Sequence, residues 1–200
     1  MHAQFEIVIR RIAGRHADMQ QVESALDSVR DRLSREIEQQ DMGKAAVLVN
    51  RFVRSLGTGS GRDAVELERT LLRELGMHPA PRSTVVIDDP ISVIALGNHV
   101  RYLTVCLGID WSDAMHFQGA VSDLANAAEN AGGAEFTFTV SHSDLACTAY
   151  FHRPGAGFDV QDALAGIDRI TLNVSTSLRG GGVEVSFSVK HSNGLKTAGL

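Results

Sequence analysis

A change of hydrophobic period at two prolines is the feature that most constrains the fold of this chain. Before Pro79 and Pro81, apolar residues recur every three or four positions, which is the spacing of amphipathic helices. After them, apolar and polar residues alternate in short runs, which is the spacing of half-buried strands. The sequence therefore predicts a helical domain over residues 1–78, an α/β domain over residues 83–190 and a flexible tail over residues 191–200.

The first domain is predicted to consist of packed helices. Five apolar residues recur at alternating spacings of three and four, which indicates one long helix with a coiled-coil-like seam. These residues are Met19, Val22, Leu26, Val29 and Leu33. Further helices are expected over residues 42–56 and 63–75, whereas residues 1–12 fit either a short strand or the start of a helix.

A helical hairpin of about this size is marginal alone, because few apolar residues are available to bury. We therefore expect the first domain to pair, either with a second copy of the chain or with the second domain. A homodimer is the prediction.

The second domain is predicted to be an α/β sandwich with helices packed on one face of a mixed sheet, or of an antiparallel one. The expected order is strand, helix, helix, strand, strand, helix, strand, strand. Strands are expected over residues 83–87, 135–140, 145–151, 169–177 and 183–190. A long helix is expected over residues 91–107, and a second one is expected to begin at a cap formed by Asp110 or Ser112 and to end before Gly132 and Gly133. Asp89 and Pro90 are typical of a helix start, and Gly108 of a helix end. The whole chain is thus predicted to belong to the α+β class.

Composition narrows the classes of function. The chain is 44% apolar with a formal net charge of −5 and has no basic block, which argues against nucleic acid as a partner. No run reaches the roughly 18 apolar residues of a membrane span, so we expect a cytoplasmic protein without a membrane partner. Cys106 and Cys147 lie far apart in apolar stretches, so they are interpreted as buried thiols.

The expected helix over residues 112–130 carries polar residues among small apolar ones. Asp123, Asn126 and Asn130 are spaced by three and four residues, so a carboxylate and two amides share one helix face. Such a face can simply be solvated, or it can be a binding site.

The order of elements and the stretch over residues 83–190 resemble the ATP-binding fold shared by histidine kinases, gyrase and Hsp90-type proteins, and residues 85–133 resemble its opening strand, first helix and nucleotide-binding helix. The resemblance is greatest to the serine/threonine kinases of bacterial partner switching, which act on anti-sigma antagonists and switch proteins. It implies ATP and Mg²⁺ as cofactors, Asp123 as the acid that polarises the attacking hydroxyl, and Asn126 as the magnesium ligand. It also implies nucleotide contacts from Asn130.

The chain departs from the family pattern at several positions. The family acid is usually Glu, with its Asn four residues later, whereas Asp123 and Asn126 are three residues apart. Gly155 and Gly157 match a family glycine motif that contacts nucleotide, although such glycines also occur in ordinary turns. Arg153 stands where the family has an adenine-binding aspartate, and a guanidinium cannot accept the adenine N–H. The segment that would form a mobile lid is missing, so the resemblance is to a degenerate form.

His16 lies just before the first apolar seam and resembles the phosphoacceptor position of histidine kinases and phosphotransferases.

Three functions follow as expectations. The first is a bacterial signalling regulator that acts by protein–protein interaction, with a sigma factor, an anti-sigma antagonist or a response regulator as its partner. The alternatives are an active serine/threonine protein kinase and a histidine phosphotransferase that uses His16.

Overall fold

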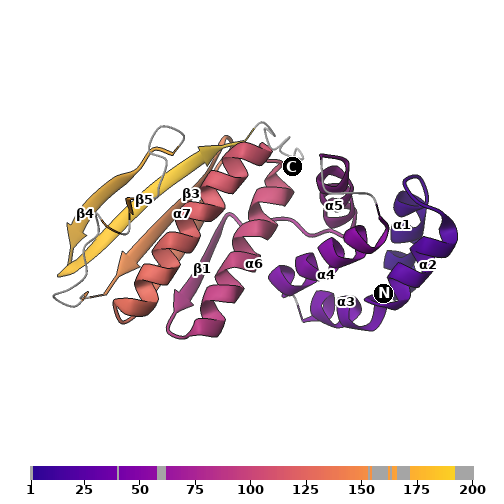
Figure 1. Cartoon of the computed structure of the whole chain (residues 1–200), viewed down its shortest axis with the longest axis horizontal. Helices are drawn as coiled ribbons and strands as arrows, with labels where there is room; N and C mark the ends of the chain where they lie inside the picture. Colours follow the sequence, from indigo (N-terminus) through magenta and orange to yellow (C-terminus); the bar gives the residue numbers. More distant parts are fainter. Residues whose placement is uncertain are drawn as a thin grey trace, which may run out of the picture. The chain divides into compact units, whose positions relative to one another are not determined.

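The computed structural model describes residues 2–39, 41–57, 62–152, 154, 162, 164–165 and 172–191. The chain divides into two compact units, Met1–His78 and Pro79–Leu200, which are treated separately below. Figure 1 shows the helices of the first unit and the sheet with its helices in the second. None of the described helices is long and apolar enough to span a membrane.

The first unit contains five helices among its described residues. They are α1 His2–Ala13, α2 Met19–Asp27, α3 Arg30–Glu38, α4 Met42–Ser55 and α5 Arg62–Glu74. Their apolar faces meet in a core that includes Leu26, Leu33, Phe52, Leu71 and Leu72. The first segment, which fitted either a strand or a helix, is the helix α1.

The prediction of one long helix through the apolar seam is wrong, because the chain breaks between α2 and α3. Val29 has a φ of −125° at the break and no side-chain cap. The Ser28 hydroxyl donates to the Ala25 carbonyl at 2.7 Å and so occupies an acceptor at the end of α2. Val22, Leu26, Val29 and Leu33 are nevertheless all buried within this unit, whereas Met19 is exposed.

The second unit is built on a five-stranded sheet in the order β1-β2-β3-β5-β4. The strands are β1 Arg82–Ile87, β2 Ala134–Val140, β3 Asp144–Phe151, β4 Ser175–Arg179 and β5 Gly182–Lys190. Every neighbouring pair is antiparallel, so the expectation of a mixed sheet is wrong and the antiparallel alternative holds. The presence of both helices and an antiparallel sheet confirms the predicted α+β class. The final hairpin turns at Gly180 and Gly181, both of which have positive φ.

Two helices, α6 Pro90–Leu107 and α7 Trp111–Asn130, pack on one face of this sheet (Figure 1). That face of the sheet is apolar and includes the buried Phe136, Phe138, Phe151 and Phe187. The ring of Phe117 on α7 meets the ring of Phe187 with their centroids 5.2 Å apart. Alternate strand residues therefore supply the core, and the residues between them face away from the helices.

The two helices begin and end where the sequence predicts. The Asp89 side chain accepts from the Ser92 N–H at 2.6 Å, and Ser92 completes a capping box around Pro90. Gly108 ends α6 in the left-handed conformation, with φ 63°.

Candidate functional site

The polar residues predicted on α7 lie together on its exposed face. Asp123, Asn126 and Asn130 are all exposed, and the Asn130 side-chain amide donates to the Asn126 carbonyl at 3.1 Å. Phe117 and Leu124 occupy the opposite face of α7 and are buried against the sheet. The carboxylate and the two amides are therefore accessible to a ligand or to a partner.

Gly155 and Gly157, together with Arg153, lie outside the described residues, so their relation to α7 stays a prediction. In the described part of the chain, no group of three or more His, Cys, Asp or Glu side chains could hold a metal ion.

His16 occupies a turn between α1 and α2, not a helix. Its N–H donates to the Ala13 carbonyl at 2.9 Å, and its side chain is exposed. Helix α2 begins after His16 because the Asp18 carboxylate caps it, accepting from the Gln20 N–H at 2.6 Å. A phosphoacceptor role for the His16 side chain stays a prediction.

The exposed faces of α6 and α7 also carry large apolar side chains. On α7, Trp111 is 60% exposed and Met115 follows one turn later. On α6, Ile91 is 74% exposed and Ile94 is similarly open. Water contact with four large apolar side chains is unfavourable, and such groups often mark interaction sites.

Two glycines lie within these helices at exposed positions, Gly97 on α6 and Gly119 on α7. A Cβ atom added at either position would meet nothing within 4 Å. Glycine inside a helix costs roughly 0.5–1 kcal/mol relative to alanine. The packing of the described residues gives no steric reason for glycine at these two positions. We name the exposed residues of these helices the docking face, defined by Ile91, Ile94, Gly97, Trp111, Met115 and Gly119.

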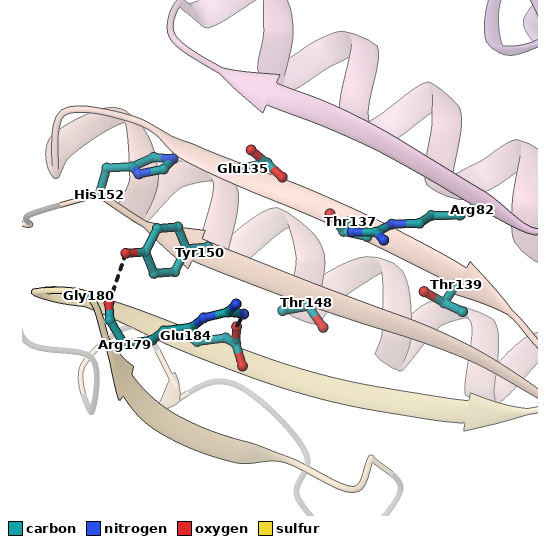
Figure 2. A pocket seen from close by; sticks show the side chains of 10 residues that line it. All are labelled: Arg82, Glu135, Thr137, Thr139, Thr148, Tyr150, His152, Arg179, Gly180 and Glu184. Carbon is teal, nitrogen blue, oxygen red and sulfur yellow. Dashed lines mark hydrogen bonds and ion pairs between the residues drawn. The ribbon is translucent and has the colours of Figure 1, made fainter.

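A second surface lies on the opposite side of the sheet, where a polar hollow of about 650 Å³ opens over the strands (Figure 2). This volume falls in the range of small-molecule sites. Its lining residues come from all five strands and from the turns that follow β3 and β4. They are Arg82, Glu135, Thr137, Thr139, Thr148, Tyr150, His152, Arg179, Gly180 and Glu184.

Hydroxyl groups form a row across the floor of this hollow. The Thr84 and Thr137 hydroxyls are 3.3 Å apart, and the Thr148 and Ser186 hydroxyls are 3.0 Å apart. The register places Thr137 directly opposite Thr148, so the row continues across four strands. The floor can therefore donate and accept hydrogen bonds with a polar ligand.

Charged groups line one end of the hollow, where Tyr150 holds the final hairpin. The Tyr150 hydroxyl donates to the Arg179 carbonyl at 2.8 Å (Figure 2). The Arg179 guanidinium lies 3.6 Å from the Glu184 carboxylate. This surface was not predicted from the sequence, although the alternating threonines of β2 are a local signal of a polar sheet face.

A comparison with models of known protein families finds no match, and none of the curated proteins searched matches the chain.

Proposed function

We propose that this protein is a regulator that acts by protein–protein interaction through the docking face. The observation that carries the proposal is the pair of open helical glycines, Gly97 and Gly119, each about one helical turn after an exposed apolar side chain, Ile94 or Met115. A glycine that lowers helix stability without relieving a clash in its own fold is explained when another backbone approaches closely.

The composition of the docking face fits a protein partner. Trp111 is the only tryptophan of the chain, and tryptophan is enriched among residues that dominate binding energy. Met115 is flexible and polarisable, so it adapts to the shape of a partner. Asp123 and Asn126 lie further along the same helix and would supply polar contacts at the rim.

The resemblance to the histidine-kinase-like ATPase fold suggests the kind of partner. Under this proposal the second unit is a degenerate member of that fold in a cytoplasmic bacterial signalling protein. The partner is then a sigma factor, an anti-sigma antagonist or a response regulator. Arg153, in place of the adenine-binding aspartate, favours docking over catalysis.

An active serine/threonine kinase is the second candidate, because Asp123, Asn126 and Asn130 share one exposed helix face. In this alternative the Asp123 carboxylate polarises the attacking hydroxyl of a partner protein. Asn126 contributes to Mg²⁺ binding and Asn130 to nucleotide binding. When bound, ATP and Mg²⁺ would supply the phosphoryl group and neutralise its charge, and the chain would contribute positioning.

The docking face is tested by capturing partners from the cells that make the protein, using full-length tagged chains. The variant Trp111→Ala/Met115→Ala removes the exposed apolar groups of α7. Leu178→Ser, on β4, is the matched control, because Leu178 is 87% exposed and lies outside the docking face. Each retained protein is then purified and titrated against all three chains by calorimetry.

We expect a partner that binds the wild type and Leu178→Ser with equal affinity and binds the double variant at least about tenfold more weakly. Circular dichroism checks that the double variant is folded. Equal affinity of the purified partner for all three chains would overturn the docking face as the binding surface.

A further inference from the structure

The backbone of β1 leaves hydrogen-bonding groups unused along one side. Among the described strands, β1 pairs only with β2 and so lies at an edge of the sheet. The Val140 N–H donates to the Pro81 carbonyl at 2.9 Å, which fixes the direction of the backbone groups. Because these groups alternate along a strand, Ser83 and Val85 face β2. Arg82, Thr84 and Val86 present their N–H and C=O groups to the free edge.

This edge lacks proline and a bulge, two of the features that usually prevent strands from pairing. The six residues Arg82–Ile87 include no proline, and their regular register with β2 shows no bulge. Val86 is a β-branched residue that is 55% exposed. An open edge of this kind is a template for an added strand.

The charges at the two ends of β1 are complementary to each other. An antiparallel pair of two β1 strands, with its twofold axis at Val85, places Thr84 opposite Val86 of the second copy. It also places Arg82 opposite Asp88 of the second copy, twice by symmetry. Cross-strand pairs of opposite charge stabilise a sheet. A shift of the register by two residues in either direction leaves both charges without this partner.

Both charged side chains are available for this pairing. Arg82 and Asp88 are exposed, and neither side chain forms an ion pair among the described residues. The Asp88 N–H donates to the Ser92 hydroxyl at 3.2 Å, which leaves its carboxylate open. In the single chain Arg82 lines the polar hollow (Figure 2), so its side chain would turn towards the edge on pairing.

We propose that a second copy of this chain binds along β1, so that the two sheets join through an antiparallel β1–β1 pair. The dimer is therefore formed by the second unit, not by the helical seam of the first. This inference is independent of the proposed function, because it uses neither the docking face nor a nucleotide.

The oligomeric state is measured on the full chain by sedimentation velocity over a range of micromolar concentrations. Arg82→Asp and Asp88→Arg each place like charges opposite one another across the proposed pair. The double variant Arg82→Asp/Asp88→Arg restores the opposite charges in exchanged positions. Thr84→Pro removes an N–H that faces the free edge and leaves the ladder with β2 intact.

We expect the wild type to form a dimer, and each single charge reversal to weaken dimerisation by about tenfold. The double exchange should recover most of that loss, and Thr84→Pro should give a monomer with an unchanged circular dichroism spectrum. A monomeric wild type would overturn the inference. A dimer that survives Thr84→Pro, or a double exchange no better than the single reversals, would overturn it equally.

Discussion

Two glycines of the second unit differ in whether the surrounding structure requires glycine. At Gly182 on β5, an added Cβ would lie 2.7 Å from the Tyr150 hydroxyl oxygen and would collide with the Phe151 carbonyl. Glycine is therefore required there so that Tyr150 can reach the Arg179 carbonyl. At Gly119 on α7 the same added atom meets nothing.

The two alanine variants should therefore shift stability in opposite directions. Gly182→Ala is expected to lower the free energy of unfolding by about 2 kcal/mol through overpacking. Gly119→Ala is expected to raise it by about 0.5–1 kcal/mol through helix propensity. Urea unfolding measures both. If Gly119→Ala is more stable yet binds the captured partner more weakly, glycine is retained for docking. Tighter binding would contradict that reason.

Glu23 provides a test of pH dependence in the first unit. Its carboxylate receives two hydrogen bonds from Arg10, at 2.7 and 3.1 Å. The hydrogen bonding by Arg10 holds the pKa of Glu23 below its ordinary value of 4.5. Because the folded pKa is depressed, the contribution to stability is present above the unfolded pKa. It is lost as the pH falls through the folded pKa.

Glu23→Gln should therefore be less stable than the wild type at pH 7 and equally stable once the carboxylate is protonated, at about pH 3 or below. Urea midpoints measured across this range provide the comparison. Glu129→Gln is the control, since Glu129 is exposed and forms no ion pair among the described residues. A difference between Glu23→Gln and the wild type that is the same at every pH would rule out this linkage.

At the scale of the elements, the start of α6 depends on one side chain. Asp89 accepts from the Ser92 N–H, and the Asp88 and Asp89 N–H groups donate back to the Ser92 hydroxyl at 3.2 and 3.3 Å. Asp89→Ala should lower the free energy of unfolding by about 1 kcal/mol, because the first turn of α6 loses its cap. Asp89→Asn should keep most of that stability.

Asp113→Ala is the matched control for the cap, because Asp113 lies in the first turn of α7 but is not its cap residue. Its expected effect on unfolding is within about 0.5 kcal/mol. Equal losses for Asp89→Ala and Asp113→Ala would indicate a general effect of charge near helix starts instead of capping.

The elements that could be predicted are those with local signals. Helices α6 and α7 follow from Asp89, Pro90 and Gly108, and β2, β3 and β5 follow from alternation. The break between α2 and α3 could not be predicted, because Val29 and Leu33 stay buried in the same apolar pattern on both sides of it. One long helix and two short ones therefore give the same sequence signal. The pairing of the strands also depends on residues far apart in the chain. The sequence pattern therefore did not distinguish a mixed from an antiparallel sheet.

Of the two candidate surfaces, one could be predicted in part from the sequence and the other could not. Helical spacing was enough to place Asp123, Asn126 and Asn130 on one face. The polar hollow was not predictable, because Arg82, Tyr150 and Glu184 become neighbours only when β1, β2, β3 and β5 lie side by side. No short-range pattern encodes that arrangement.

At the scale of the whole molecule, the phosphotransferase alternative makes its own prediction. If His16 accepts a phosphoryl group, incubation with a phosphorylated response regulator should give an acid-labile phosphate on the wild type. His16→Ala should lose that label, whereas His78→Ala should keep it, because His78 is another exposed histidine of the same unit. Label that persists in His16→Ala would exclude this residue as the acceptor.

The second unit presents three surfaces: the docking face of α6 and α7, the polar hollow on the opposite side of the sheet, and the free edge of β1 between them. Docking can therefore be altered by substitution without changing dimerisation, whereas Arg82 belongs both to the hollow and to the edge. Asp123 and Asn126 lie on the same helix as part of the docking face, so substitutions at the surface do not by themselves distinguish the regulator from the kinase.

Nucleotide binding is the measurement that decides between them, because only the kinase requires it. If the protein is the regulator, calorimetry of the full chain with ATP and Mg²⁺ should give a dissociation constant of about 1 mM or weaker. This corresponds to a binding free energy of roughly 4 kcal/mol or less in magnitude. Asp123→Asn should then weaken partner binding only slightly, because a polar contact at the rim contributes little to affinity. Micromolar binding that Asn126→Ala abolishes would instead support the kinase, as would partner phosphorylation that Asp123→Asn abolishes. Glu129→Gln is the control for both variants, because it neutralises a neighbouring exposed carboxylate of α7 that has no role in either mechanism.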